Sequence, residues 1–422
     1  MHPSVENTIR RYVCQEKLDR IRLTLENGAG IMRSLVTTDV TMDKLLWGGE
    51  AGTPAGKYAR ITRNPLRPST PLAKTPHVKL LAAYAEIGES ALETAYFEKS
   101  DYFRNALETM EIAGSYFDCR NPGEIVRHAR RFVNSFIGKA KNDSGVEFAS
   151  PEKMPVQVRR IAHSDGCYEV VDGHHRLAIA CVRSEKSFPV YVRKEDPVMT
   201  PLQQLVLDVF WTKGKRLLYQ PVDSPELGSK WRLVRQCADR FHMMHSFLEA
   251  NRTHGDTASY LDVGSSYGWF IDQMRKQGYE AWGVERDPAA IDLGFLLYNV
   301  PRELVFKENL VSYLEMCVER FNVVSCFSVI HHFALGLGRI SAEELLRLLD
   351  KVTNEVLFFD TGQEHEMWFR ESLRGWNPEF IADWISRNSS FTHVTALGVD
   401  QDSQLPGQKF NYGRTLFACT RK

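Results

Sequence analysis

The chain has 422 residues, 43% apolar and 25% charged, with a formal net charge of zero, which is the composition of a soluble globular protein. This length exceeds one ordinary domain, so we expect two or three. The charge balance disfavours nucleic acid as the main partner, because proteins that bind phosphate backbones usually carry a marked basic excess. No sequence run approaches the roughly 18 apolar residues that span a bilayer, so no membrane span is expected.

Residues 1–74 are predicted to form an N-terminal extension. Apolar residues at helical spacing predict an amphipathic helix over 1–26, which ends at Asn27-Gly28. Residues 47–76 are rich in glycine and proline, which favours a long loop or a strand with a loop. The start lacks the apolar core of a signal peptide, so a cytoplasmic location is expected. The eight cysteines show no ligand-like spacing, which indicates reduced side chains.

Residues 75–195 are predicted to form an α+β domain. Helical periodicity runs through 77–88, 91–114 and 123–138. Short strands then follow at 155–163, 167–173 and 188–194, with a helix over 174–184 between the last two. Residues 196–230 contain prolines and glycines and are predicted to be a linker to the next domain.

From residue 231 onward, predicted helices and strands alternate. Helices are predicted at 231–251, 269–278, 288–298, 312–320 and 341–352, and strands at 259–264, 280–285, 303–309, 322–329 and 355–361. This alternation predicts an α/β domain with a parallel sheet covered by helices on both faces. Two final strands, 391–399 and 414–421, are separated only by a loop, which indicates an antiparallel end of the sheet.

The stretch YLDVGSSYGWF, residues 260–270, is the first candidate site. Ligands gather at the carboxyl ends of parallel strands, and Gly264 and Gly268 let the backbone turn tightly there. The carboxylate of Asp262 suits a ligand that is cationic or rich in donors, and it would repel a pyrophosphate. At the end of the next strand, Glu285 is placed to accept both hydroxyls of a ribose.

These residues resemble those of the class I S-adenosylmethionine-dependent methyltransferases, over about 231–422. The resemblance implies a Rossmann-like sheet with an antiparallel last strand and S-adenosyl-L-methionine as cofactor. Ser266 stands where the family usually has its middle glycine, and Asn309 where an aspartate is commoner. The implied cofactor-binding residues are Asp262, Gly264, Ser265, Gly268, Glu285, Arg286, Asn309, Leu310 and Phe327.

His331 and His332 follow the fourth predicted strand on the side where an acceptor would arrive, and they are the catalytic candidates. Methyl transfer from a sulfonium is chiefly a matter of positioning, and a base is needed only if the acceptor keeps its proton. Our hypothesis is that His332 is that base; the alternative is that the histidines only fill the loop. Glu364, His365 and Glu366 are consecutive, which rarely suits one metal ion, so no metal is expected.

The second candidate site is the run Asp172, Gly173, His174, His175 and Arg176, at the junction of a predicted strand and helix. A helix N-terminus with basic side chains suits a phosphate. The run resembles the glycine-then-basic motif of the ParB/sulfiredoxin-like superfamily, over about 120–195. The resemblance implies binding of a phosphate or a nucleotide such as CTP, ATP or ADP. The alternative is a scaffold in which Arg176 only forms a salt bridge.

The leading functional hypothesis is methyl transfer to a small molecule, such as a sugar, a glycan or a secondary-metabolite intermediate in biosynthesis. The segment from 369 onward is similar to methyltransferases of bacterial polysaccharide pathways, including those that cap O-antigen chains. Alternatives are a bifunctional kinase and methyltransferase, a nucleotide-gated regulator without turnover, and a nucleic-acid methyltransferase. The assembly state stays open, with a homodimer as one option.

Overall fold

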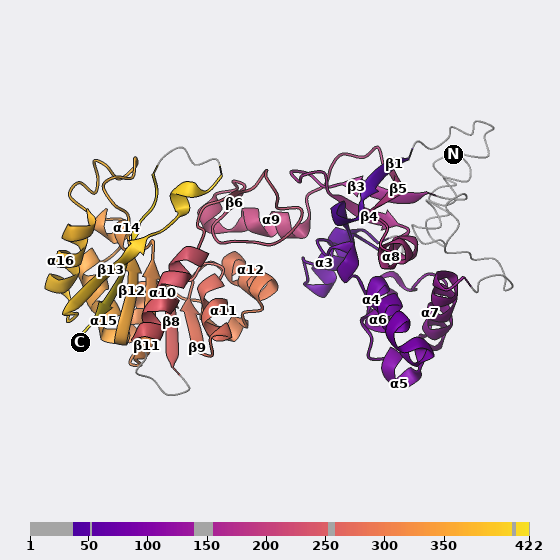
Figure 1. Cartoon of the computed structure of the whole chain (residues 1–422), viewed down its shortest axis with the longest axis horizontal. Coiled ribbons are helices and arrows are strands. Elements are labelled where there is room, and N and C mark those ends of the chain that lie inside the picture. The colour runs from indigo at the N-terminus through magenta and orange to yellow at the C-terminus, as the bar shows by residue number, and fades with distance from the viewer. Residues whose placement is uncertain (1–36, 51–52, 139–154, 252–257, 407–410, 422) are drawn as a thin grey trace. The chain divides into compact units, whose positions relative to one another are not determined.

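The computed structural model describes residues 37–50, 53–138, 155–251, 258–406 and 411–421. The chain divides into two compact units (Figure 1): unit 1 comprises 1–204 and 224–230, and unit 2 comprises 205–223 and 231–422. The helix predicted over 1–26 lies outside the described residues. Within the described ranges, no helix combines the length and hydropathy that a membrane crossing requires.

Unit 1 contains a five-stranded mixed sheet. In the spatial order β1-β5-β3-β4-β2, β3 runs parallel to β5 and antiparallel to β4. The predicted strands over 155–163, 167–173 and 188–194 are confirmed as β3, β4 and β5, each shorter than the pattern suggested. The strands are β1 (Thr38–Thr41), β2 (Leu45–Leu46), β3 (Val156–Arg160), β4 (Tyr168–Asp172) and β5 (Ser187–Val192).

Helix α8 (His174–Val182) joins the sheet of unit 1 to its other helices. Leu177 packs in the cluster formed by the strands, whereas Ala178 and Ile179 pack in a cluster of helical residues. Both sides of α8 are therefore held, which fixes the turn at its start. The other helices are α3 (Ala55–Thr62), α4 (Pro76–Ile87), α5 (Thr94–Phe97), α6 (Asp101–Ala113) and α7 (Pro122–Phe136).

The loop predicted over 47–76 is wrong in part, because α3 lies within it. Ala55, Tyr58 and Ala59 are buried at helical spacing, and the hydroxyl of Tyr58 donates to Thr109 Oγ1 on α6 at 2.9 Å. Burial against a distant helix thus overrides the weak helix preference of a glycine-rich segment.

Unit 2 contains a seven-stranded sheet in the order β10-β9-β8-β11-β12-β14-β13. The first five strands in chain order pair in parallel, and β14 is antiparallel to both β12 and β13. The predicted parallel sheet with an antiparallel end is confirmed. The strands are β8 (Ser259–Val263), β9 (Glu280–Val284), β10 (Val305–Phe306), β11 (Phe321–Phe327), β12 (Thr353–Asp360), β13 (His393–Val399) and β14 (Thr415–Thr420).

Both faces of this sheet carry helices, because successive residues of a buried strand point to opposite sides. In β8, Leu261 and Val263 belong to the cluster with α13, α15 and α16, whereas Tyr260 belongs to the cluster with α10 and α11. The helices are α10 (Ala238–Ala250), α11 (Trp269–Lys276), α12 (Pro288–Tyr298), α13 (Leu310–Met316), α14 (Ile330–Ala334), α15 (Ala342–Val352) and α16 (Pro378–Asn388).

Two further sequence expectations differ from the structure. The helix predicted from 231 begins only at Ala238, after Cys237, which has a positive φ of 64°. Before it, β7 (Arg232–Leu233) pairs in parallel with β6 (Leu217–Leu218). Within the segment predicted as linker, α9 (Pro201–Asp208) forms, and residues 205–223 belong to unit 2.

Candidate active site

The glycine turn lies between β8 and α11, at the carboxyl end of the middle strand of the five parallel ones. Gly264 and Gly268 have φ of 82° and 76°, conformations that favour glycine. A Cβ at Gly264 would lie 2.9 Å from Val329 Cγ2. The amides of Gly264 and Ser265 both donate to the carbonyl oxygen of Val284, at 3.0 and 3.1 Å. The turn is thus tied to the end of β9.

Asp262 is buried beneath this turn. Its Oδ1 accepts a hydrogen bond from Ser325 Oγ at 2.7 Å, whereas its Oδ2 has no hydrogen-bond partner among the described residues. Burial raises the pKa of Asp262 to about 7, against the hydrogen bond from Ser325 and with a contribution from Glu285. A small cavity lined by Asp262, Gly264 and Phe327 adjoins it. A buried unpartnered acceptor suits a ligand that brings a donor or a positive charge.

Glu285 directly follows β9 and accepts hydrogen bonds from main-chain amides of the neighbouring loops. It accepts from the amides of Ser266, Arg286 and Asp287 at 2.9, 2.8 and 2.9 Å. Burial raises its pKa, and these three hydrogen bonds oppose that shift. Asn309 caps α13, since its Oδ1 accepts from the amide of Val311 at 3.0 Å. The structure therefore places these polar residues at the ends of β9 and β10, as the sequence spacing suggests.

A second cavity, of about 250 Å³, lies beyond β11 and β12, and we call it the acceptor pocket. It shares Tyr219 and Arg235 with the small cavity beside Asp262, so the two spaces adjoin. Its lining residues are Trp211, Tyr219, Arg232, Val234, Arg235, Ser328, His331, His332, Trp368, Phe369, Tyr412 and Arg414.

Both candidate histidines lie on α14 and line the acceptor pocket. His331 is buried, and its Nδ1 accepts from the amide of Gly362 at 3.3 Å. Burial, together with Arg414 and His332, holds the pKa of His331 well below its usual range. His332 is exposed at the pocket, and burial of its ring atoms, Arg414 and Arg286 lower its pKa. Both rings are therefore neutral at physiological pH.

A network of buried ion pairs between side chains lies next to these cavities. Arg240 is 2% exposed and pairs with Asp360 at 3.0 Å and with Asp402 at 3.1 Å. Asp402 also accepts from Arg235 at 2.7 Å. Arg414 forms a two-pronged pair with Glu366 at 2.8 and 2.9 Å. Sequence reasoning missed this network, and only Asp360, at the carboxyl end of β12, stands where a strand-end rule could have found it.

Residues 216–221 lie within the predicted linker, and we call them the strap. They are bound to the glycine turn. The side chain of Gln220 bridges this turn, since its Nε2 donates to the carbonyl of Ser265 and its Oε1 accepts from the amide of Trp269, both at 3.2 Å. The amide of Tyr219 donates to the hydroxyl of Tyr267 at 3.4 Å. The strap thereby brings Tyr219 to both cavities, a placement that its sequence did not signal.

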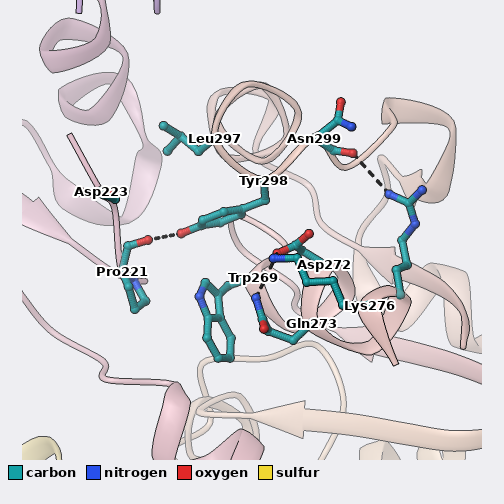
Figure 2. A pocket seen from close by; sticks show the side chains of 10 residues that line it. Pro221, Asp223, Trp269, Asp272, Gln273, Lys276, Leu297, Tyr298 and Asn299 are labelled. Atoms are coloured by element: carbon teal, nitrogen blue, oxygen red, sulfur yellow. Dashed lines mark hydrogen bonds and ion pairs between the residues drawn. The ribbon is translucent and has the colours of Figure 1, made fainter. Parts of the chain in front are cut away.

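A third and more open cavity, of about 690 Å³, shares no lining residue with the other two. Figure 2 shows the hydroxyl of Tyr298, on α12, directed at the carbonyl oxygen of Pro221, to which it donates. On α11, Lys276 pairs with Asp272 at 2.6 Å. The hydrogen bond from Tyr298 to Pro221 fixes the end of the strap to α12. The lining residues are Pro221, Asp223, Trp269, Asp272, Gln273, Arg275, Lys276, Leu297, Tyr298 and Asn299.

In unit 1, the run from Asp172 to Arg176 crosses from β4 into α8. Gly173 has φ of 103°, and no side chain caps the helix start. Arg176 Nη2 lies 3.4 Å from Asp172 Oδ2. His174 and His175 are buried, with their Nε2 atoms 2.7 Å from the carbonyl oxygen of Trp47 and 2.9 Å from the hydroxyl of Tyr102. Burial lowers the pKa of both histidines.

The two histidines belong to a larger buried cluster that sequence reasoning missed. Glu50 pairs with His77 at 2.8 Å and with Arg67 at 3.2 Å. Burial acts to raise the pKa of Glu50, but His77, His174 and Arg67 outweigh it and hold that pKa below its usual range. In the described part of the chain, no group of three or more His, Cys, Asp and Glu side chains is arranged to hold a metal ion.

The geometry of unit 2 defines a Rossmann-like α/β domain with adjoining cavities at the carboxyl ends of its parallel strands. Residues 232–389 match the family model that describes a methyltransferase domain. Unit 2 thus carries a methyltransferase domain over these residues. A search of curated proteins found no match.

Among solved structures, similarity is found to proteins that differ widely in length. The bifunctional kinase-methyltransferase WbdD is 17% identical, with a TM-score of 0.42 over 52% of this chain and 46% of that chain. Magnesium protoporphyrin IX methyltransferase (ChlM) from Synechocystis PCC 6803 is 12% identical, with a TM-score of 0.32 over 43% and 79%. A SAM dependent methyltransferase from Archaeoglobus fulgidus is 14% identical, with a TM-score of 0.30 over 42% and 93%. The chain therefore spans less than half the length of WbdD.

Proposed function

We propose that unit 2 transfers the methyl group of S-adenosylmethionine to a small-molecule acceptor. The observation that carries this proposal is the unpartnered Oδ2 of Asp262, buried beside the glycine turn in a domain that matches a methyltransferase model. A cationic group would supply the missing partner. The acceptor classes proposed are a sugar, a glycan or a secondary-metabolite intermediate.

In this proposal, S-adenosylmethionine supplies a methyl group carried on a sulfonium. Asp262 receives the positive methionine end, and Glu285 accepts a ribose hydroxyl at Oε2, the oxygen that receives only one main-chain donor. Phe327 lines the small cavity beside Asp262 and shields the transfer from water. The remaining proposed contacts, from the turn to the adenine end, are Gly264, Ser265, Gly268, Arg286, Asn309 and Leu310.

His332 is the proposed base where the acceptor must lose a proton. It lines the acceptor pocket, and its lowered pKa leaves the ring neutral and able to accept. A base of this kind contributes about 10²- to 10⁴-fold, so the His332→Ala variant is expected to lose at least about 10²-fold in kcat. Full turnover by that variant with the true acceptor would remove His332 from this role.

Titration of the full-length protein with S-adenosylhomocysteine in a calorimeter tests the donor site. Saturable binding at one site supports the proposal, and no binding overturns it. Release of S-adenosylhomocysteine from S-adenosylmethionine with a cell extract then separates an enzyme from a regulator that senses the cofactor without turnover. Buffer with extract and no protein is the control for that assay.

For unit 1 we propose a phosphate- or nucleotide-binding module of the ParB-like kind, working as a kinase or as a gate for the methyltransferase. It is supported by the start of α8 after Gly173, because a helix N-terminus suits a phosphate, and by Arg176 beside Asp172. His174 and His175 are buried and bonded, so we assign them to holding the turn.

Binding of CTP, ATP or ADP is expected to be lost in the Arg176→Ala variant and kept in Arg183→Ala. Arg183 lies at the other end of α8 and donates to the carbonyl of Phe136 at 3.0 Å, which makes it a matched control. A charged hydrogen bond to phosphate is worth roughly 1.5–3 kcal/mol, or about 10- to 100-fold in affinity. Calorimetry is the measurement, and equal nucleotide binding by wild type and Arg176→Ala would contradict the assignment.

A further inference from the structure

The lining of the acceptor pocket is basic and aromatic. Of its residues, Arg232, Arg235 and Arg414 carry positive charge, and the structure records no aspartate or glutamate in the described lining. A pocket for an uncharged sugar usually offers carboxylate acceptors to the hydroxyl groups as well as donors. In the described lining of this pocket, the charged side chains are all donors.

Two of these arginines pair with acidic residues that do not line the pocket. Asp402 holds Arg235 and Glu366 holds Arg414, and neither carboxylate lines the pocket. Arg232 is exposed on β7, and its side chain forms no ion pair or hydrogen bond with the residues that the structure describes. Among the described residues that line the pocket, Arg232 is therefore the arginine without an acidic partner.

The walls of the pocket are flat aromatic rings. Trp368 and Tyr412 stack at 4.4 Å between centroids, with an angle of 15° between their planes. On the strap side, Trp211 and Tyr219 contact each other at 5.0 Å. The volume of about 250 Å³ has room for a single-ring molecule. Aromatic walls of this kind favour a planar apolar body over a hydrated polar one.

We propose that the acceptor is a compact molecule with a flat ring and a carboxylate, held by Arg232 and the aromatic walls. The planar guanidinium matches a carboxylate in two parallel hydrogen bonds. This inference rests on the proposed methyl transfer. Of the three proposed acceptor classes, it selects secondary-metabolite intermediates, and among these the ring-bearing acids, over sugars and glycans. A phosphate dianion would need several more donors than one exposed arginine provides.

The test uses the full-length protein saturated with S-adenosylhomocysteine and two probes of equal shape, 4-hydroxybenzoate and 4-hydroxybenzamide. The carboxylate probe is expected to bind about 10- to 100-fold more tightly than the amide in calorimetric titrations. In Arg232→Gln this preference is expected to fall close to one, whereas Arg347→Gln keeps it. Arg347 is exposed on α15, outside the pocket lining, so it controls for the change in net charge.

Equal affinity for the two probes, no binding of either, or an unchanged preference in Arg232→Gln would each overturn this inference. Tighter binding of methyl glucoside than of 4-hydroxybenzoate would also overturn it, in favour of a sugar acceptor. The first titration, with S-adenosylhomocysteine alone, keeps the two proposals apart. Failure there overturns the methyl transfer itself, and success followed by no carboxylate preference overturns only the acceptor class.

Discussion

Replacing Arg240 with methionine is expected to lower the free energy of unfolding of unit 2 by about 3 to 5 kcal/mol, the usual loss when one partner of a buried ion pair is removed. Arg240 is 2% exposed and faces Asp360 and Asp402. Burial, together with Asp402 and Asp360, already raises the pKa of Asp400 to about 7, although Arg240 and Arg235 act against this shift. Without the guanidinium, the remaining carboxylates must stay charged without a full partner, or take up protons.

Tryptophan fluorescence during denaturant unfolding of the full chain measures this loss. Of the eight tryptophans, only Trp47 belongs to unit 1, so the signal reports on unit 2. Arg387→Met is the matched control, because Arg387 forms an exposed pair with Asp383 on α16, and such pairs contribute about 0 to 1 kcal/mol.

Coupling within the network is a further check on this expectation. The Asp360→Asn change removes one of the charges that Arg240 neutralises, so the double variant should lose less than the sum of the two single variants. A loss below about 1 kcal/mol in Arg240→Met, or strict additivity with Asp360→Asn, would show that the network does not support unit 2 in the way proposed here.

The repeating elements of unit 2 follow from local patterns in the sequence. Alternation of apolar strands and amphipathic helices depends on residues close along the chain, and it predicted the parallel strands and the antiparallel end. The turn at Gly264 and Gly268 is also local, because positive φ angles select glycine there. These features were accessible without coordinates.

The supports of the site depend on residues far apart in the sequence. Arg240 meets Asp360 and Asp402 across separations of 120 and 162 residues, and no local pattern marks such partners. The prediction that the strap is part of a linker missed its contacts for a related reason. A short segment with proline and glycine has the composition of a linker, yet Gln220 holds it to the turn through side-chain bonds to main-chain atoms.

The contacts of His174 and His175 also could not be predicted from local sequence. Their types and their position at a helix start suggested phosphate contacts. The structure instead buries His174 and His175 against Trp47 and Tyr102, partners contributed by segments far along the chain. A side chain's direction is set by packing, which the sequence pattern of one helix does not contain.

The affinity for S-adenosylhomocysteine is expected to rise by about fivefold between about pH 6 and 7, and to level off above the pKa of Asp262. Burial raises that pKa to about 7 in the free protein, so below it the carboxyl holds a proton that a cationic ligand must displace. The stability of the free protein changes with pH in the opposite direction. An acid with a raised pKa makes the free protein less stable as pH rises through that value.

The Asp262→Asn variant separates these two effects. It is expected to be more stable than the wild type at about pH 8 without ligand, because no buried charge is left. It should bind S-adenosylhomocysteine about 10- to 100-fold more weakly, with no rise in affinity between about pH 6 and 8.

Glu285→Gln is the control, since Glu285 also has a raised pKa yet should leave the rise with pH in place. Calorimetry across this pH range gives the affinities, and tryptophan fluorescence gives the stabilities. A wild-type affinity that stays flat with pH, or an equal slope in Asp262→Asn, would mean that Asp262 does not receive the positive end of the ligand.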